Sequence, residues 1–216
     1  RQHVYGHHAE CNKDGLDPDI NAYPIRLCNT QKYEWFHKYQ LIYTFPLYSL
    51  TSFSMFINDL FSVHSRNWKE SLLIILGKLI HLELFIIIPY NIYGNRIIYS
   101  YVVSHMIGSL IIAIIFQVSH ISSKLQFNNN NNWIENEIKS TQDYRVNCKI
   151  TSMVTGGLNM QVLHHLFPKV SQIYYPLIYE HVEHKLKKEE ICITKYQTFF
   201  EAFSTHIKQL SRMSHI

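Results

Sequence analysis

Two apolar stretches joined by a short loop constrain the fold of this chain more than any other feature. The first runs from Leu72 to Tyr90, and the second, from Ile97 to Val118, meets the roughly 20 residues that a spanning helix needs. Only the segment NIYGNR separates them. Because a bilayer offers no partners to open backbone polar groups, stretches of this kind span as helices. We therefore predict a transmembrane helical hairpin and an all-α, integral membrane fold.

The composition agrees with a membrane protein that also has long polar segments. Hydrophobic residues make up 47% of the chain and charged residues 17%, against roughly a quarter charged in an average soluble protein. The net charge of +4 is spread along the chain, so nucleic acid is not an expected partner. A mild basic excess fits loops that face the anionic cytoplasmic leaflet. The four cysteines form no C-x-x-C pair, which fits a reducing, cytosol-facing location.

The rest of the chain is polar or mixed. The run Asn128 to Asn132 indicates a solvated loop. From Ile150 to Ile216 the sequence mixes charged helix formers with aromatic residues and has no stretch long enough to span. A chain of 216 residues suits one domain, and we expect that domain to cover residues 1–216.

Histidines gather in two clusters, which are far apart in the sequence. The clustered residues are His3, His7 and His8 in HVYGHH, and Gln161, His164 and His165 in QVLHH. On a helix, residues three or four apart share a face, so the members of each cluster can converge. Adjacent histidines diverge by about 100°, which suits ligands of two metals better than one tetrahedral site. Imidazoles without thiolates favour iron or zinc over calcium, magnesium or an iron–sulfur cluster.

Most other histidines are isolated in the sequence. We interpret such residues as surface or packing histidines, for example His37, His64, His105 and His206. His120 differs because it follows the end of the second apolar stretch. From there it could complete the same metal site from the membrane side.

The position of the two clusters limits the topology. If both clusters bind one metal centre, they lie on the same side of the membrane, and the chain between them crosses it an even number of times. Three apolar stretches lie between the clusters. The earliest, Tyr39 to Val63, is interrupted by Pro46, Asn58 and Asp59. We therefore predict that this stretch is interfacial or re-entrant.

Two segments resemble a known enzyme family. GHHAECNKDGLDPDI resembles the second histidine box and following segment of membrane fatty acyl desaturases, and TGGLNMQVLHHLFPKVSQIYYPLI resembles their third box. Gln161, where other desaturases have His, is similar to the front-end (delta-5/delta-6-like) subgroup, which inserts a double bond between an existing one and the carboxyl end. The tail YQTFFEAFSTHIKQL resembles the end of delta-5 members. The resemblance covers nearly the whole chain apart from the asparagine run.

The resemblance implies a set of site residues and a chemistry. The iron ligands would be His3, His7, His8, His120, His164 and His165. Gln161 and Asn159 would lie beside the ligands or the substrate. The reaction would use two iron ions, dioxygen as co-substrate, and electrons from cytochrome b5 and its NADH-dependent reductase, because no side chain attacks an unactivated C–H bond.

The resemblance also implies a substrate and a location. The substrate would be a fatty acyl lipid or acyl-CoA. The protein would be a multi-pass membrane protein, in the endoplasmic reticulum, with a cytosolic helical cap that carries the histidine boxes and the di-iron site.

Several features depart from the family pattern. The first histidine box, which the family places before Arg1, and an HPGG haem motif are not in this chain, so we expect a partial domain that is inactive alone. Six imidazoles also fall short of the roughly ten positions that two octahedral irons offer. Glu10 and Cys11 precede Asn12, where the family has an aromatic residue and Thr, and Leu163 stands where Glu is common.

Two alternatives stay open at this point. One is a related lipid hydroxylase or sphingolipid desaturase, which would use the same site. The other is a non-catalytic membrane protein that retains the boxes and binds zinc or no metal.

Overall fold

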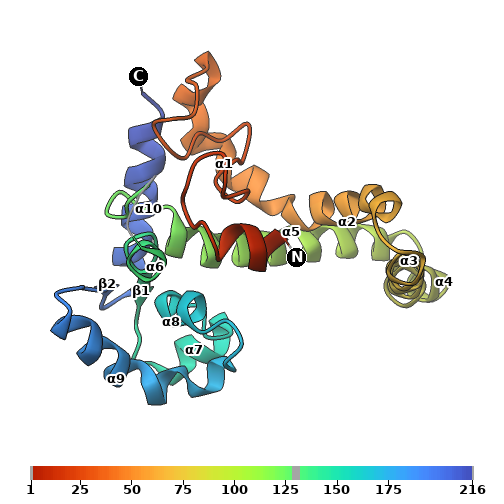
Figure 1. Ribbon diagram of the computed structural model, residues 1–216. Coiled ribbons are helices and arrows are strands. Elements are labelled where there is room, and N and C mark those ends of the chain that lie inside the picture. The colour runs from red at the N-terminus through yellow and green to blue at the C-terminus, as the bar shows by residue number, and fades with distance from the viewer. Residues whose placement is uncertain (1, 128–131, 216) are drawn as a thin grey trace. The chain divides into compact units, whose positions relative to one another are not determined.

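The computed structural model describes residues 2–127 and 132–215, and most of them are helical (Figure 1). Most of the predicted asparagine loop, 128–131, lies outside the described residues. Asn132 is described and caps the next helix, accepting a hydrogen bond from the backbone N–H of Glu135.

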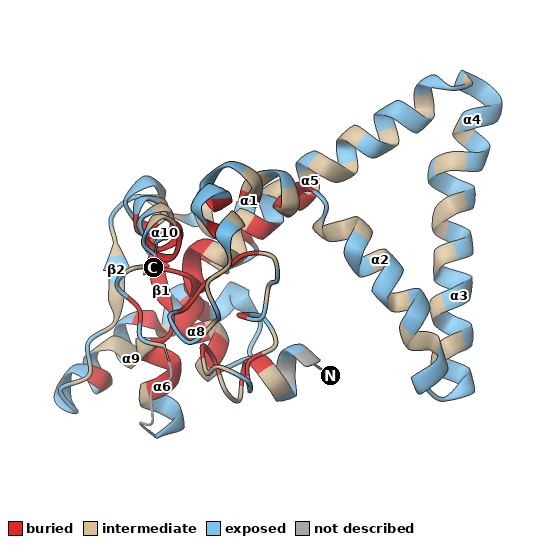
Figure 2. Cartoon of the chain, turned by 90° about the horizontal axis from the view of Figure 1, so that it is seen from above, coloured by how far each residue is buried: buried red, intermediate tan, exposed pale blue. Residues whose placement is uncertain are grey.

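The chain divides into two compact units. Unit 1 comprises Arg1–Thr44 and Ile115–Ile216, and unit 2 comprises Phe45–Ile114. In Figure 2 most of the buried residues lie in unit 1, while the helices of unit 2 are mostly intermediate or exposed. The expectation of a single domain over 1–216 stays a prediction.

Unit 2 holds most of the apolar helical sequence. Its elements are the second part of α1 (Gln40–Ser49), α2 (Thr51–Ser62), η3 (Val63–Ser65), α3 (Trp68–Leu82), η4 (Glu83–Ile87), α4 (Ile88–Tyr93) and most of α5 (Arg96–His120). Two helical stretches, Trp68–Tyr93 with 26 residues and Arg96–His120 with 25, are long and apolar enough to cross a membrane. They coincide with the two predicted stretches. Large apolar side chains on the first are exposed, as Leu73 is at 70%, which suits contact with hydrocarbon.

A π-helical turn, η4, lies inside the first of these stretches, just before Pro89. Proline has no N–H, and its ring crowds the carbonyl four residues earlier, which here belongs to Phe85. A wider turn at this point relieves the crowding while the helical path continues. The stretch therefore keeps its full length despite the proline.

The interrupted stretch Tyr39 to Val63 forms two shorter helices. α1 and α2, with 10 and 12 residues, are separated at Leu50. Pro46 lies inside α1 and cannot donate a backbone hydrogen bond there. Asp59 of α2 forms an ion pair with Lys78 of α3, with 2.9 Å between Oδ2 and Nζ. Neither helix has spanning length, and an interfacial position for them stays a prediction.

Unit 1 is helical apart from one small sheet. Its elements are η1 (Gln2–His7), η2 (Trp35–Tyr39), the start of α1, the end of α5, α6 (Trp133–Lys139), β1 (Gln142–Tyr144), α7 (Lys149–Thr155), α8 (Gln161–Leu166), η5 (Gln172–Tyr174), α9 (Tyr175–Lys188), β2 (Thr194–Tyr196) and α10 (Phe199–Met213). β1 and β2 pair in parallel, with Gln142 opposite Thr194. Among the described residues, this pair of three-residue strands is the departure from the all-α expectation.

Two clusters of buried side chains hold α8 in place. One contains Met160, Leu163, Tyr175 and Tyr179, and the other contains Ile138, Val162 and Leu186. Adjacent residues of α8, Val162 and Leu163, thus enter different clusters. The helix is fixed from two sides, and its polar residues face the remaining side.

Side-chain hydrogen bonds to the backbone connect the irregular segment after η1 to the C-terminal helix. Gln40 Nε2 donates to the carbonyl of Leu210, and Gln209 Nε2 donates to that of Leu27. α10 itself begins with a capping box formed by Thr198 and Glu201. Residues near the two ends of the chain therefore belong to one packed unit.

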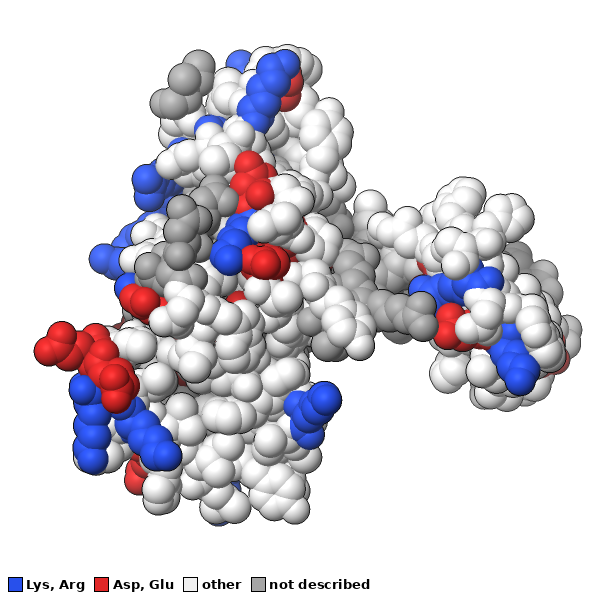
Figure 3. Space-filling model, viewed as in Figure 1, with Lys and Arg blue, Asp and Glu red and all other residues white. Residues whose placement is uncertain are grey.

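Charged side chains of both signs lie on the surface. On the face of unit 1 seen in Figure 3, Lys and Arg alternate with Asp and Glu. That face therefore carries both positive and negative side chains.

Candidate metal centre

The first histidine cluster lies on a π-helical turn, where an α-helix was expected. In η1 the backbone N–H of His8 donates to the carbonyl of His3, five residues earlier, at 3.0 Å. This winding places the His3 ring near both of the others. Its centroid lies 5.3 Å from that of His7 and 4.6 Å from that of His8. One turn therefore brings three imidazoles together, whereas α-helical spacing aligns His3 with His7 alone.

The second cluster lies on α8. Val162 and Leu163 enter the apolar clusters, so Gln161, His164 and His165 face the opposite way. The start of this short helix is stabilised by Asp143 of β1, whose Oδ1 accepts a hydrogen bond from the backbone N–H of Val162 at 3.0 Å.

His120 is the last residue of α5, and its ring joins those of the two clusters. Its centroid lies 4.5 Å from that of His7 and 4.8 Å from that of His165. Residues from three distant parts of the sequence thus meet within unit 1. The structure brings together all six histidines that the sequence suggested.

The six histidines divide into two groups of metal-binding size. One group is His7, Cys11, His120 and His165, and the other is His3, His8 and His164; within each, the ligand atoms lie within 4.8 Å of one another. We call these the inner and the outer group, because every member of the first is buried. A third overlapping set joins Asp19 to His3 and His7.

Each pair of adjacent histidines is split between the groups. His7 and His165 belong to the inner group, while His8 and His164 belong to the outer group. The groups adjoin, since the rings of His8 and His165 stack with their centroids 4.2 Å apart. This arrangement offers two neighbouring metal positions, as expected from the divergence of adjacent side chains.

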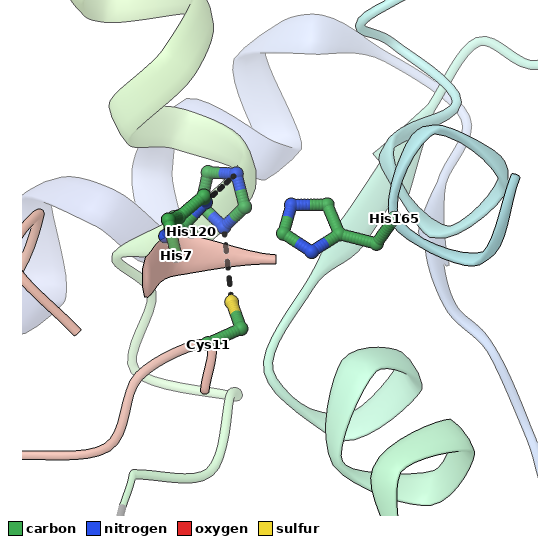
Figure 4. A group of neighbouring side chains, drawn as sticks. All are labelled: His7, Cys11, His120 and His165. Atoms are coloured by element: carbon green, nitrogen blue, oxygen red, sulfur yellow. Dashed lines mark hydrogen bonds between the residues drawn. The ribbon is translucent and has the colours of Figure 1, made fainter. Parts of the chain in front are cut away.

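Buried carboxylates orient two imidazoles of the inner group. Nδ1 of His7 lies 3.0 Å from Oδ2 of Asp17, and Nδ1 of His165 lies 2.5 Å from Oε2 of Glu137. A histidine that gives its Nδ1 proton to a carboxylate keeps its Nε2 lone pair for a metal. Figure 4 shows the His165 ring reaching from α8 toward His120 and Cys11.

Several ring nitrogens are buried without a hydrogen-bond partner. They include Nε2 of His165 and of His164. A buried polar atom without a partner is costly, so such atoms call for an explanation. Two such nitrogens, one in each group, fit ligand atoms that face metal ions.

Burial favours neutral imidazoles in both groups. Burial, together with the neighbouring histidines, lowers the pKa of His8 to about 4 and that of His164 to about 3. The pKa of His165 is also lowered by burial. His7 is the exception: burial lowers its pKa, but the hydrogen bond and charge of Asp17 outweigh this and raise it overall. Burial raises the pKa of Glu137 to about 8.

The two non-histidine residues expected at the site have different surroundings. Nε2 of Gln161 lies 2.8 Å from Nε2 of His120, so its amide meets the ring nitrogen that faces the inner group. The side chain of Asn159 binds the carbonyls of Tyr144 and Arg145, which ties the turn before α8 to β1. Their suggested roles toward ligands or substrate stay predictions.

The sequence did not indicate the surrounding residues Cys11, Asp17, Asp19 and Glu137 as part of the site. Only their nearness to the first histidine cluster could have suggested the first three, and Glu137 follows the asparagine run without any motif. The isolated His206 is buried and lies 2.8 Å, through Nδ1, from the carbonyl of Ile121. His64 is exposed. Both lie outside the two groups, as surface or packing histidines would.

Comparison with known proteins gives a consistent similarity. The family model for fatty acid desaturases matches residues 1–196. The chain is 32% identical to the acyl-lipid (8-3)-desaturase B of Dictyostelium discoideum, over 98% of this chain and 52% of that protein. It is 30% identical to the acyl-lipid (8-3)-desaturase of Physcomitrium patens, over 99% and 49%, and 29% identical to the Delta(5) fatty acid desaturase A of D. discoideum, over 98% and 51%.

The chain thus spans about half the length of the curated relatives that it matches. No solved structure matches it.

Proposed function

Because this chain belongs to the fatty acid desaturase family, we propose that it is the di-iron-binding part of a front-end fatty acyl desaturase. The enzyme introduces a cis double bond between an existing double bond and the carboxyl end of an acyl chain. The relatives are named (8-3)- and Delta(5) desaturases, which supports this regiochemistry. So does Gln161 at the first position of QVLHH.

One observation carries the proposal: both pairs of adjacent histidines are divided between the inner and the outer group. A single metal ion would take its ligands from one group. Two neighbouring metal ions would each take one histidine from the pair His7 and His8 and one from the pair His164 and His165. His3, His7, His8, His120, His164 and His165 are the proposed ligands. Imidazole suits iron, and the partnerless Nε2 atoms of His164 and His165 fit ligand atoms.

The iron pair would supply the oxidising power that side chains lack. In the overall reaction, two hydrogens leave adjacent methylene carbons, and dioxygen is reduced to two waters with two electrons and two protons. Cytochrome b5 and its NADH-dependent reductase supply the electrons. A fatty acyl lipid or acyl-CoA is the substrate.

The residues of this chain orient the ligands, and burial favours the neutral form of His8, His164 and His165. Asp17 and Glu137 accept the Nδ1 protons of His7 and His165, which fixes each ring with Nε2 toward the metal position. The surrounding burial excludes water from the inner group. Since six imidazoles fall short of the roughly ten positions of two octahedral irons, ligands outside this set complete the coordination.

The protein is a multi-pass membrane protein of the endoplasmic reticulum, with the histidine boxes facing the cytosol. Two candidate spans, Trp68–Tyr93 and Arg96–His120, lie between the two boxes. An even number of crossings returns the chain to the side it left. The α1–α2 segment then lies at the bilayer surface, where its apolar and polar residues meet both environments.

Expression of the gene in yeast supplied with polyunsaturated fatty acids tests the proposal. We expect a new double bond on the carboxyl side of an existing one, located by mass spectrometry of derivatised fatty acids. The His165→Ala variant should give no product. A hydroxylated product would favour a related hydroxylase, and an unchanged fatty acid profile with one zinc and no iron in the purified protein would favour a non-catalytic protein.

A further inference from the structure

Cys11 lies in the inner group, although all other members of that group are histidines. Its side chain is fully buried, and its Sγ lies 3.5 Å from Nδ1 of His120. The same sulfur also lies 3.9 Å from the carbonyl oxygen of Ser140, to which the thiol can donate its proton. The sulfur lone pairs are then free to face His120.

The contact with Cys11 completes a pattern among the three imidazoles of the inner group. Nδ1 of His7 faces Asp17, Nδ1 of His165 faces Glu137, and Nδ1 of His120 faces Cys11. In each ring the opposite nitrogen is Nε2, which has no partner in His165 and lies against the amide nitrogen of Gln161 in His120. Cys11 thus has the place that a buried carboxylate has beside the other two rings.

The contacts at Nε2 of His120 give the same orientation independently. This atom lies 3.4 Å from Nε2 of His7 and 2.8 Å from the amide nitrogen of Gln161. With the amide in this orientation, the N–H of Gln161 donates to Nε2, which goes with a ring proton on Nδ1, toward the sulfur; a metal ion at Nε2 would take the place of the amide contact. Figure 4 shows the His120 ring with His7 at one nitrogen and Cys11 at the other.

A second observation indicates a ligand at this group. Nε2 of His165 is buried without a partner, and its side chain is fully buried. One ring nitrogen of His165 lies within 4.8 Å of a ligand atom of each of His7, Cys11 and His120. The inner group therefore contains, besides the cysteine sulfur, a ring nitrogen that is available as a metal ligand.

Hydrogen bonds on both sides fix the backbone at Cys11. Asn12, with a positive φ of 57°, donates through Nδ2 to the carbonyls of His120 and Ser140 at 2.9 and 3.0 Å. Asn136 Nδ2 donates to the carbonyl of Cys11 at 3.1 Å. The sulfur is thus held against the end of α5 by a network that does not depend on a metal.

We propose that Cys11 is a positioning residue: its sulfur accepts the Nδ1 proton of His120 and so directs Nε2 of His120 to the inner metal position, without binding the metal itself. This inference rests on the proposed metal-binding function. It assigns His120 one tautomer and one ring orientation.

Metal binding by the purified protein in detergent tests the inference with three variants. Cys11→Val is close in size but has no acceptor, and we expect it to lower the affinity for Fe(II) and Co(II) at the inner position roughly 10–100-fold. Cys11→Ser restores an acceptor and should bind within a few-fold of the unchanged protein. Cys28→Ser is the control, because Cys28 is buried outside both groups and contacts Thr30.

Three results would overturn the inference. If Cys11→Val is folded by circular dichroism and binds metal as tightly as the unchanged protein, the sulfur has no positioning role. If the Co(II)-loaded protein shows an intense thiolate charge-transfer band that Cys11→Ser lacks, the sulfur is a direct ligand. If the unchanged protein binds no metal, the proposed function itself fails, which distinguishes that outcome from the first two.

Discussion

Nδ1 of His165 lies 2.5 Å from Oε2 of Glu137, and both side chains are completely inaccessible to solvent. This pair joins α8 to α6, and it leaves Nε2 of His165 as a buried atom without a partner. The carboxylate is thus part of the site although no sequence motif marked it.

Glu137→Gln keeps an oxygen beside His165 but removes the group that can ionise to a carboxylate when a metal ion binds. Because a carboxylate partner raises the basicity of a ligating imidazole, we expect metal affinity to fall roughly 10–100-fold. Competition with a chelator of known affinity measures this. Glu135→Gln on the same helix is the control, since Glu135 pairs with Lys139 away from the site. Equal affinities of the two variants would contradict the role of Glu137.

Single and double histidine substitutions test the division into two groups. His164→Ala should lower the iron content from about two to about one per chain, because it removes an outer ligand only. Adding His8→Ala, in the same group, should lower it little further. His165→Ala combined with His164→Ala should abolish binding.

Iron content by mass spectrometry of the purified variants measures these differences. His184→Ala, at an exposed position of α9, is the control. A complete loss of both metals in His164→Ala alone would show one shared site and contradict the two-group arrangement.

Asp143 makes stability depend on pH. Burial raises the pKa of its carboxyl from 3.8 to about 7, partly opposed by hydrogen bonds from the backbone of Val162 and the hydroxyl of Tyr179. Between pH 4 and 7 the folded state therefore keeps a proton that the unfolded state has lost. The free energy of unfolding falls as pH rises through this interval, by a total of roughly a few kcal/mol, and is flat above it.

Asp143→Asn should make this slope shallower while keeping an acceptor for Val162, and the remaining slope comes from groups such as Glu137, whose pKa burial raises to about 8. Thermal unfolding in detergent at pH 5 to 8 measures it, with the exposed Glu180→Gln as the control. The same slope in Asp143→Asn and the unchanged protein would contradict the assignment.

Gly157 should tolerate alanine less well than its neighbour Gly156. Both have positive φ, which costs a non-glycine residue about 1–2 kcal/mol. A Cβ at Gly157 would also lie 2.5 Å from Cβ of Gln172, whereas at Gly156 it would meet nothing within 4 Å. We expect Gly157→Ala to melt several degrees below Gly156→Ala, at about 2–4 °C per kcal/mol. Equal melting temperatures of the two variants would show that η5 moves away from the added methyl group without cost, and would contradict this prediction.

A cysteine in the short loop between the candidate spans tests the topology. In sealed microsomes, a membrane-impermeant maleimide should label the exposed Cys192 at once, but Asn95→Cys only after permeabilisation. Peptide mapping separates the two sites. Labelling of both before permeabilisation would mean that the hairpin does not cross the membrane.

The helical hairpin could be predicted because length and apolarity alone define it. The expected stretch Ile97 to Val118 differs from α5 by one residue at its start and two at its end. The π-helical turn η4 could not be predicted from the sequence. Whether a helix kinks or widens before Pro89 depends on what the turn packs against.

The histidines of the site were predictable because adjacent pairs with helical spacing are rare and point in fixed directions. The π-helical winding at His3 was not, since it is specified by one hydrogen bond of His8. Glu137 and Asp17 could not be found either. Their roles depend on how α6 and the turn after the first histidine cluster fold against the other histidines, and single carboxylates in polar segments have no distinguishing pattern.

The assignment of His164 and His165 to different groups has a consequence for rigidity. Consecutive Cα atoms are about 3.8 Å apart across a trans peptide, whatever the surrounding loops do. His7 and His8 are adjacent in the same way and are also divided between the groups. Displacement of α8 as a whole would therefore move one member of the inner group and one member of the outer group together.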